Sequence, residues 1–485
     1  QFLGISRGIV VITKTDSVDD EVLELVNLDI NESLTGTMFE AVPLVYVDSI
    51  KNKGIDELKD VLFQQLQSVP KRDYYGAFRL PIDQVFTVQG IGTIVRGTVY
   101  EGSISKHNQL TVLPINKKAK ARNIQVHRQN VSTAYAGQRV AINLAGIDHH
   151  ELKRGDVLVN SNHFLVTQTI DVAIQFIDKL RYPLKQRSPV KLHTGTVEVM
   201  GEIVFFDRNR VDQTTDEILC QIRLNEPIVV RRGDRFILRR PTPIETIGGG
   251  WIIDPNGDKY RFGKQTMNML HQKKEGTPEQ RLHELLATHL VLDQTQIIRY
   301  LSVNAEEVNA IIKHSVESNQ LIELTNKRYI RHKDFIKVKD EILTFINEYH
   351  ERYPMRQGIN KAEIVQVLAE IYPIDMIDTS IQSLIENQKL VRNQQYLRNA
   401  TFYPSLSTKW KTRMEQIINE LQSDGLQVKK WEEYVESTPL PKEQVSELAN
   451  YLLVTGQAYQ LTDDMYVHHI PFEQSLKLLR NGTNA

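Results

Sequence analysis

The chain has 485 residues, with 59 Lys and Arg against 60 Asp and Glu, and a formal net charge of −1. A composition of 41% hydrophobic and 25% charged residues is that of a folded globular protein, and the length allows roughly three to five domains. No run of 18 or more apolar residues occurs, which excludes a membrane span and predicts no membrane partner. The single cysteine, Cys220, excludes a disulfide framework and a cysteine-ligated zinc site, and it indicates a reducing, cytoplasmic compartment.

The charges are distributed unevenly along the chain. Residues 275–485 carry 23 basic and 29 acidic side chains, whereas residues 1–274 carry 36 basic and 31 acidic ones. A surface that binds nucleic acid is therefore expected in the first half or in local basic patches.

The first segment has the pattern of an α/β domain. An apolar run at residues 8–13 predicts a buried parallel strand, and residues 43–47 predict a second one. Apolar residues at helical spacing follow each run, at 19–28 and 55–66. Residues 1–69 are thus expected to be the C-terminal part of a doubly wound domain. Because the N-terminus is neither a signal peptide nor a methionine start, the chain is expected to begin inside that domain.

The pattern changes to all-β from about residue 79 to residue 258. Short β-branched runs alternate with Gly, Asn and Asp turns, which predicts small β-barrels. We expect one at 70–160 and a second at 161–260. The glycine-containing segment 257–265 looks like an incomplete phosphate-binding loop with one residue too many, and we interpret it as a linker.

After residue 275 the pattern is helical and repeats. Similar tripeptides recur around Gln320, Gln388 and Gln457, each after an amphipathic helix and before two short strands around a polar turn. Helices followed by a strand pair in one repeat are the layout of a winged helix, and a period this long indicates repeated domains. We predict winged helices at 275–334, 335–403 and 404–470, and the start of a fourth at 471–485.

A polar tetrad directly follows the first predicted strand. Thr13, Lys14 and Asp16 would lie at the carboxyl end of that strand, where α/β sheets bind nucleotides. The Asp16 carboxylate could accept two hydrogen bonds from guanine, although such a Lys/Asp pair is more often a solvated turn. The phosphate-binding pattern GxxxxGK[ST] does not occur in the sequence. We therefore expect this chain to have no catalytic residues and to be inactive alone as a GTP hydrolase.

Long runs in both predicted barrels carry a family resemblance. They are residues 78–99, 136–147 and 154–158 for the first barrel and 192–196 and 233–239 for the second, and a Gly-rich segment follows at 241–250. The runs resemble those of translational GTPases related to elongation factor Tu. The Gly-rich segment and the winged-helix tail narrow the resemblance to the bacterial selenocysteine-specific elongation factors. The resemblance covers nearly the whole chain. It implies a multidomain fold: the C-terminal part of an α/β P-loop-type G domain, two β-barrels, then tandem winged-helix (α+β) domains.

The resemblance also implies a nucleotide site. Residues 13–16 are similar to the [NT]KxD guanine signature, and Ser49 would supply a second guanine contact, with Asp48 in place of the usual Ser. Guanine-binding residues are then Thr13, Lys14, Asp16 and Ser49. The parent protein would use GTP and Mg²⁺. Its phosphate and magnesium sites are expected in a missing N-terminal part, and the rest of the fourth winged helix in a missing C-terminal part.

An aminoacyl-tRNA pocket on the first barrel is a further implication. The family's pocket positions fall on Asp83, Gln84, Phe86, Arg96 and Arg139. The ordinary factor has Thr and Asn at the two arginine positions. Guanidinium groups favour an anion, and a selenol ionises more readily than a thiol, whereas serine is neutral. The alternative is that both arginines bind tRNA phosphate or pair with Asp83.

The function implied is GTP-dependent delivery of selenocysteinyl-tRNA to the ribosome at recoded UGA codons by a cytoplasmic monomer. The winged-helix tail would recognise the selenocysteine-insertion hairpin of the mRNA. Two alternatives remain: another translational GTPase similar to elongation factor Tu, and a non-catalytic RNA-binding adaptor with a vestigial G domain. Basic residues of the tail are RNA-binding candidates, or else solvated charges. They are Lys327, Arg328, Arg331, Lys333, Lys409, Lys411, Arg413, Lys429 and Lys430. No metal site is expected, because the histidine pairs are adjacent rather than spaced as ligands.

Overall fold

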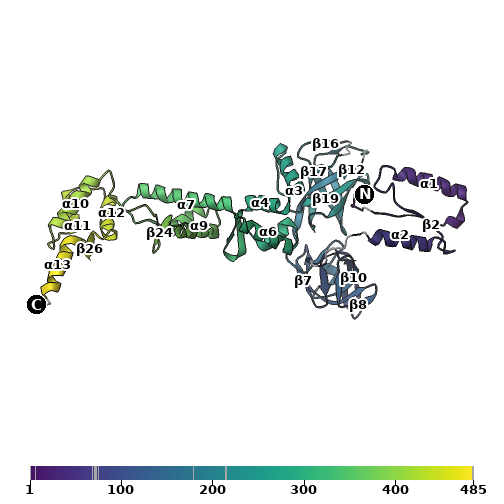
Figure 1. Cartoon of the computed structure of the whole chain (residues 1–485), viewed down its shortest axis with the longest axis horizontal. Helices are drawn as coiled ribbons and strands as arrows, with labels where there is room; N and C mark the ends of the chain where they lie inside the picture. Colours follow the sequence, from purple (N-terminus) through teal and green to yellow (C-terminus); the bar gives the residue numbers. More distant parts are fainter. Residues whose placement is uncertain are drawn as a thin grey trace. The chain divides into compact units, whose positions relative to one another are not determined.

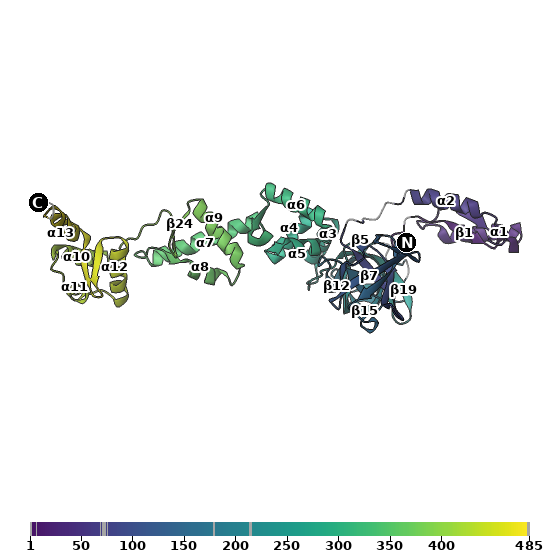
Figure 2. The same cartoon turned by 90° about the horizontal axis from the view of Figure 1, so that it is seen from below.

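The structure is a computed structural model that describes residues 2–5, 7–67, 69, 74, 76–177, 180–212 and 216–482 (Figures 1 and 2). Three predicted domain limits, at residues 1, 70 and 485, lie outside the described residues. The chain divides into two compact units, 1–285 with 294–313 and 286–293 with 314–485. Within the described ranges, no helix is both long and apolar enough to cross a membrane.

The N-terminal α/β segment has two strands and two helices, as predicted in type and order. They are β1 (Val10–Thr13), α1 (Asp20–Leu34), β2 (Leu44–Val47) and α2 (Ile55–Gln67). The two strands are parallel, with Thr13 opposite Val47. The predicted burial of the first strand was wrong. Only Ile12 of β1 is buried, because within the described residues β2 is its single strand neighbour.

The first β-barrel is an antiparallel sheet closed on itself. Its strands are β3 (Arg79–Val88), β4 (Gly92–Thr98), β6 (Gln109–Leu113), β7 (Lys117–Val126), β10 (Arg139–Ala145) and β11 (Val157–Val159), with the short β5 (Ser103–Ser105), β8 (Gln129–Val131) and β9 (Thr133–Tyr135). The order is β10-β4-β3-β11-β6-β7, and pairing of β10 with β7 joins the two ends. Leu80, Val112 and Ile142 are among the aliphatic side chains that fill the interior.

The second barrel closes in the order β12-β17-β15-β14-β18-β19. These strands are β12 (Val166–Phe176), β14 (Pro189–Thr194), β15 (Val197–Val204), β17 (Ile218–Val229), β18 (Arg235–Arg240) and β19 (Glu245–Asp254), with a small separate pair β13 (Leu184–Lys185) and β16 (Arg210–Val211). A Cβ on Gly250 would lie 1.9 Å from the carbonyl oxygen of Ala173, so this glycine allows β19 to approach β12. Cys220 lies in the core, and burial raises the pKa of its thiol.

A buried ion cluster joins the two barrels. Arg79 is 4% exposed, donates to Asp234 at 2.6 and 2.7 Å, and pairs with Glu101 at 2.7 Å. Arg231 pairs with the other oxygen of Glu101. Burial alone would lower the pKa of Arg79, but the charges of Asp234 and Glu101 raise it. The barrels are thus held by charges that have little access to water.

A helix that the sequence did not predict follows the second barrel: α3 (Lys264–Glu275). The interpretation of residues 257–265 as a linker was wrong. The Gly257 N–H donates to the Thr169 carbonyl at 3.1 Å, and the Gly263 N–H donates to the Phe206 carbonyl at 2.8 Å. The segment is therefore bonded to the barrel rather than spanning a gap.

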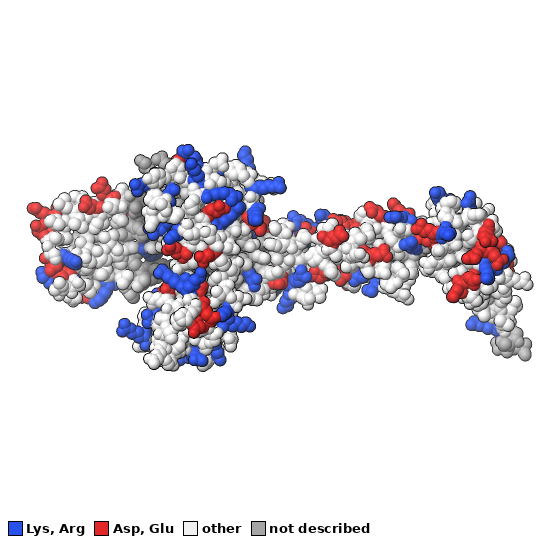
Figure 3. All heavy atoms as spheres, turned by 180° about the vertical axis from the view of Figure 1, so that it is seen from behind, with Lys and Arg blue, Asp and Glu red and all other residues white. Residues whose placement is uncertain are grey.

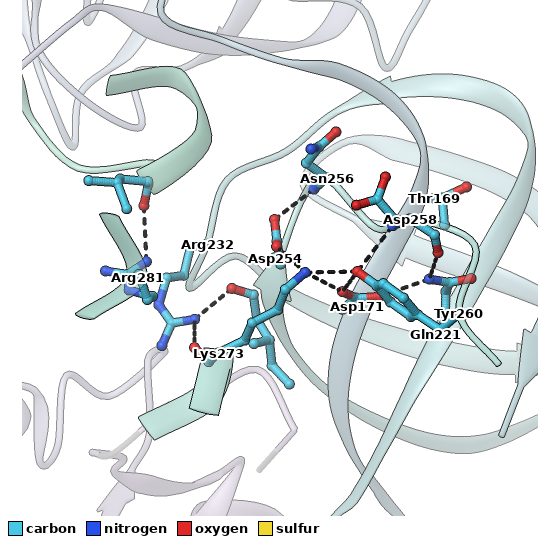
Figure 4. A network of polar contacts seen from close by, with 12 residues as sticks. Thr169, Asp171, Gln221, Arg232, Asp254, Asn256, Asp258, Tyr260, Lys273 and Arg281 are labelled. Carbon is cyan, nitrogen blue, oxygen red and sulfur yellow. Dashed lines mark hydrogen bonds and ion pairs between the residues drawn. The ribbon is translucent and has the colours of Figure 1, made fainter. Parts of the chain in front are cut away.

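Buried polar side chains fasten α3 to the second barrel (Figure 4). Lys273 Nζ lies 2.6 Å from Asp254 Oδ2 and 3.1 Å from Asp171 Oδ2. Tyr260 Oη and Gln221 Nε2 each donate to the Asp171 carboxylate at 2.9 Å. Burial raises the pKa of Asp171, and the two carboxylates raise the pKa of Lys273 against the effect of burial. Each buried charge in this cluster therefore has a partner.

The helical region begins with a capping box. Thr277 and Gln280 each donate a backbone N–H to the other's side chain, at 2.9 and 3.3 Å. The first elements are α4 (Pro278–His289), β20 (Leu292–Asp293), α5 (Gln294–Leu301) and α6 (Ala305–Glu317).

The predicted repeat of helices followed by a strand pair is present three times. The remaining elements are β21 (Leu321–Leu324), β22 (Arg328–Arg331), α7 (His332–Arg352), β23 (Ile359–Asn360), α8 (Lys361–Leu368), α9 (Ile374–Glu386), β24 (Leu390–Asn393), β25 (Tyr396–Asn399), α10 (Lys411–Ser423), α11 (Trp431–Ser437), α12 (Lys442–Val454), β26 (Ala458–Thr462), β27 (Met465–His468) and α13 (His469–Gly482). The hairpins β21–β22, β24–β25 and β26–β27 follow α6, α9 and α12. The predicted fold class is therefore confirmed, whereas the exact domain limits remain predictions.

Candidate nucleotide, aminoacyl and RNA sites

The loops after β1 and β2 meet at one edge of the small parallel sheet. Asp16 lies in a short 3-10 turn (Thr15–Ser17) that follows Lys14, whose φ of 59° is left-handed. Lys51 from the second loop places its Nζ 3.7 Å from Asp16 Oδ2. The structure therefore brings the Thr13–Asp16 tetrad next to the loop that carries Ser49.

Asp48 shapes the second loop. One carboxylate oxygen accepts the backbone N–H groups of Ile50 at 2.8 Å and Lys51 at 3.1 Å, and Asp48 and Lys53 exchange two backbone hydrogen bonds. This turn buries Asp48 and leaves Ser49 exposed. Asp48, which stands in place of the usual Ser, therefore stabilises the conformation of this loop.

The predicted guanine-binding residues lie together at this edge of the sheet. Asp16 offers a partly exposed carboxylate at the carboxyl edge of the sheet, with Lys14 beside it in the chain. No GxxxxGK[ST] pattern occurs in the sequence. The residues of this chain can thus take part in base recognition, and none is assigned to the phosphates or to Mg²⁺.

A β-bulge positions Asp83, the first of the predicted aminoacyl-pocket residues. The pairing of β3 with β4 shifts between Ile82 and Gln84, so Asp83 is the extra residue. A bulge re-aims a side chain, and here the Asp83 carboxylate reaches Arg139 at the start of β10. Both terminal nitrogens of Arg139 donate to it, Nη2 at 3.3 Å from Oδ1 and Nη1 in a closer contact with Oδ2. This is the ion pair named above as the alternative role of Arg139.

Arg96 lies apart from that pair and covers an aromatic ring. Its Cζ is 4.7 Å from the ring centroid of Phe86, and its Nη1 is 3.4 Å from Gln84 Oε1 across the β3–β4 pairing. Such a cation–π contact contributes about 0.5–1 kcal/mol at an exposed site. The five predicted pocket residues therefore form two small groups on one face of the barrel.

An open hollow of about 540 Å³ lies beside Asp83 and is lined by residues 83–86 and 152–154. Lys153 donates to Glu226 at 2.9 Å, which raises the pKa of Lys153, and Arg154 Nε donates to the Thr196 carbonyl at 3.3 Å. The prediction missed residues 152–154. The only signal for them was Arg154, which begins one of the runs that carry the family resemblance.

The basic cluster on the first wing is partly neutralised. Arg328 Nη1 lies 2.7 Å from Asp375 Oδ2, and Arg331 donates to Asp334 at 2.5 and 2.9 Å. Within the described residues, Lys327 and Lys333 have no carboxylate within ion-pair distance. The two lysines are the cations of this cluster that remain available for an anion.

The second basic cluster is Lys409, Lys411, Arg413, Lys429 and Lys430. Three of these five cations have carboxylate partners. Lys429 lies 3.0 Å from Glu420 and 3.1 Å from Asp424, and the hydrogen bonds that it donates to both carboxylates raise its pKa. Lys430 and Lys411 have carboxylates at 3.8 and 3.9 Å. Arg413 donates to a backbone carbonyl at 2.9 Å, and Lys409 Nζ lies 5.3 Å from the Trp410 ring centroid. Figure 3 shows acidic and basic side chains intermixed over the tail.

Three family descriptions match successive parts of the chain. "Elongation factor Tu domain 2" matches residues 92–159, the first barrel. "Selenocysteine-specific elongation factor, beta-barrel domain" matches residues 168–259, the second barrel. "Elongation factor SelB, winged helix" matches residues 343–398.

Whole-chain comparisons agree with these matches. The selenocysteine-specific elongation factor of Desulfomicrobium baculatum is 28% identical over 99% of this chain and 76% of that protein. The one from Methanocaldococcus jannaschii is 30% identical over 51% of this chain and 56% of that protein. A crystal structure of a bacterial selenocysteine-specific elongation factor has the same fold, with a TM-score of 0.66 at 20% identity over 98% of this chain and 74% of that chain. The chain is thus similar over nearly its whole length to a selenocysteine-specific elongation factor, and its second barrel and one winged helix match descriptions of that family, SelB.

Proposed function

We propose that this protein delivers selenocysteinyl-tRNA to the ribosome at recoded UGA codons, in the cytoplasm, as a monomeric translational GTPase. The observation that carries the proposal is the similarity of nearly the whole chain to a selenocysteine-specific elongation factor, and the proposed selective contact is the guanidinium of Arg139, which Asp83 holds at one face of the first barrel. A barrel of this kind would bind the aminoacyl end of a tRNA. Arg139 would then make that binding depend on the side chain of the amino acid.

The preference follows from charge. Asp83 takes two of the five N–H donors of the Arg139 guanidinium. The remaining donors can face an anionic side chain, and a hydrogen bond to a charged group contributes about 1.5–3 kcal/mol. Selenocysteine is ionised near neutral pH and serine is not, so only the former gains this contact.

GTP is the proposed nucleotide, with its base at Thr13, Lys14, Asp16 and Ser49. Asp16 supplies the acceptor that distinguishes guanine from adenine. Because this sequence has no GxxxxGK[ST] pattern, we infer that the 485 residues bind the triphosphate and Mg²⁺ weakly and do not hydrolyse GTP alone.

The tail is proposed to bind the mRNA selenocysteine-insertion hairpin. Support comes from the winged-helix match and from Lys327 and Lys333, the unpaired cations of the first wing. Few available cations imply few phosphate contacts and a shallow dependence of affinity on salt.

Protection of the aminoacyl ester from hydrolysis tests the function. Selenocysteinyl-tRNA and seryl-tRNA with the same tRNA body are incubated with the full gene product and GTP. Stronger protection of the selenocysteinyl ester is expected. Equal protection of the two esters would contradict selenocysteine specificity, and no protection of either would contradict tRNA delivery.

A further inference from the structure

One basic surface of the first barrel is used by none of the sites above. Residues 102–147 contain seven Lys and Arg residues and no Asp or Glu. In β7 the exposed Lys118, Lys120 and Arg122 alternate with the buried Ala119 and Ala121. Because side chains alternate between the faces of a strand, the three cations lie in a row on the outer face, about 6.6 Å apart.

The row has uncharged neighbours. In the register of the sheet, Thr111 of β6 stands opposite Lys118, and Gln109 stands opposite Lys120. On the other side of β7, Ala145 of β10 stands opposite Lys120. Over the part of the chain that the structure describes, none of the three cations has a carboxylate within ion-pair distance, whereas the adjacent Lys117 is paired with Glu151.

A hollow of about 720 Å³ adjoins Lys118. It is lined by residues of β6, by the β6–β7 turn, by residues 160–162, 164 and 165 between the barrels, by Val166 of β12, and by Arg299 of α5. Arg299 is fixed there, because its Nε donates to the Asn162 carbonyl at 2.9 Å. The lining contains two cations and several amides and hydroxyls, and no carboxylate among its described residues. An anion entering the hollow would meet donors without a repelling charge.

This surface is separate from the aminoacyl pocket. In the closed ring β10-β4-β3-β11-β6-β7, strand β7 is three strands away from β3 in either direction. The row on β7 therefore lies on the opposite side of the barrel from Asp83. A ligand there would not compete with the aminoacyl end.

We propose that Lys118, Lys120 and Arg122, with the adjoining hollow, form an RNA-backbone-binding surface, here called the β7 surface. It would take the phosphates of an RNA segment other than the one that carries the amino acid, and in this respect it rests on the proposed function. Unpaired cations contribute the affinity. Gln109, Thr111 and Asn116 supply hydrogen bonds to phosphate and 2′-hydroxyl groups, which position an RNA without reading its sequence. The winged-helix tail differs from this row, because five of its nine RNA-binding candidates have carboxylate partners.

Fluorescence anisotropy of a labelled 20-nucleotide oligouridylate on the whole chain tests the proposal. The triple variant Lys118→Gln, Lys120→Gln, Arg122→Gln removes the row. The control Arg187→Gln, Arg208→Gln, Arg210→Gln removes the same charge from the second barrel, where each arginine has a carboxylate partner. Affinities are measured from 0.05 to 0.3 M salt, and thermal unfolding checks that both variants are folded.

The row predicts at least about tenfold weaker binding for the first variant at 0.1 M salt, and a log–log salt slope shallower by about 2, since each lost phosphate contact on a single strand contributes about 0.7. The control is expected to stay within about twofold of the parent. Equal affinities for the two variants, or no salt-dependent binding by the parent, would overturn the proposal. Ester protection distinguishes the β7 surface from the proposed function. The first variant is expected to keep the parent's preference for selenocysteinyl-tRNA. A parent protein without any preference would refute the proposed function and would not affect the proposal of the β7 surface.

Discussion

At the scale of single residues, one inserted position organises the face of the first barrel that we propose to bind the aminoacyl end. Asp83 is the bulged residue of β3, and only this extra residue points its carboxylate at Arg139 on another strand. The pair is largely accessible, with the Arg139 side chain 55% exposed. An exposed ion pair contributes only about 0–1 kcal/mol to stability. Its main effect is therefore to fix the guanidinium in place.

Ion pairs with carboxylates also determine which cations of the first wing are available to RNA. The double variant Lys327→Gln, Lys333→Gln should weaken hairpin binding and make the log–log salt slope shallower by about 1–2, because neither lysine has a carboxylate partner among the residues that the structure describes. The matched variant Arg328→Gln, Arg331→Gln should have a smaller effect, since those charges are already neutralised by Asp375 and Asp334. Filter binding at several salt concentrations distinguishes them, and the opposite ranking would show that the ion pairs open on RNA.

At the scale of elements, α3 combines buried charge with an apolar contact to the barrel, which Leu270, Met267 and Met269 make. Arg232 supports the Lys273 cluster by donating to the carbonyls of Ile253, Lys273 and Lys274 at 2.6–2.8 Å (Figure 4). It therefore caps the C-terminal end of α3 on the barrel. Burial and the nearby Arg281 lower the pKa of Arg232 to about 10.

Lys273→Met should destabilise the second barrel by about 3–5 kcal/mol, because it leaves Asp171 and Asp254 buried without their cation. Urea unfolding measures this loss. The further change Asp171→Asn in the same chain should recover part of the stability. Full stability of Lys273→Met alone would mean that water or movement of α3 solvates the two carboxylates.

The same variant should respond to pH. Burial raises the folded-state pKa of Asp171 above its unfolded value near 3.9, so the folded state binds the proton more tightly. Stability then falls as pH rises from about 3.9 through the raised pKa. Removing the Lys273 cation raises that pKa further, so the deficit of Lys273→Met should shrink as the pH is lowered. A deficit independent of pH would contradict the unpaired-carboxylate explanation.

The elements also show what the sequence could predict. Strong periodicity and turn residues located both barrels, the two N-terminal strands and helices, and the hairpin after each of α6, α9 and α12. Helix α3 was missed because much of its attachment is polar: Lys273 bonds to Asp171 and Asp254, far away in the sequence. The bulge at Asp83 and the carboxylate partners of the tail cations were missed for the same reason. Each depends on which residues the fold brings together, and no local pattern contains that information.

At the scale of the whole molecule, the two barrels are expected to unfold together. Asp234→Ala leaves the 4%-exposed Arg79 with one carboxylate fewer, which should cost about 3–5 kcal/mol and separate the unfolding of the two barrels. Scanning calorimetry should show one barrel transition in the parent and two in the variant. The exposed-pair control Arg187→Gln should leave a single transition, and a single, unshifted transition in Asp234→Ala would contradict the coupling.

The whole chain is also expected to lack GTP hydrolysis, because Asp16 is proposed to bind the guanine base and no residue is proposed to bind the phosphates. Single-turnover hydrolysis with ribosomes measures this. A rate above that of ribosomes alone would show that other residues bind the triphosphate.

We expect Arg139 to supply the proposed preference for selenocysteine, and ester protection in the full gene product measures that preference. The two tRNAs share their RNA contacts, so those contacts cancel in the ratio of affinities. Arg139→Asn should weaken selenocysteinyl-tRNA by about 1.5–3 kcal/mol and seryl-tRNA very little. Lowering the pH until the selenol is protonated should abolish the preference of the parent and leave the ratio of the variant unchanged. Equal weakening of both tRNAs would contradict the account and identify Arg139 as a contact to the tRNA backbone.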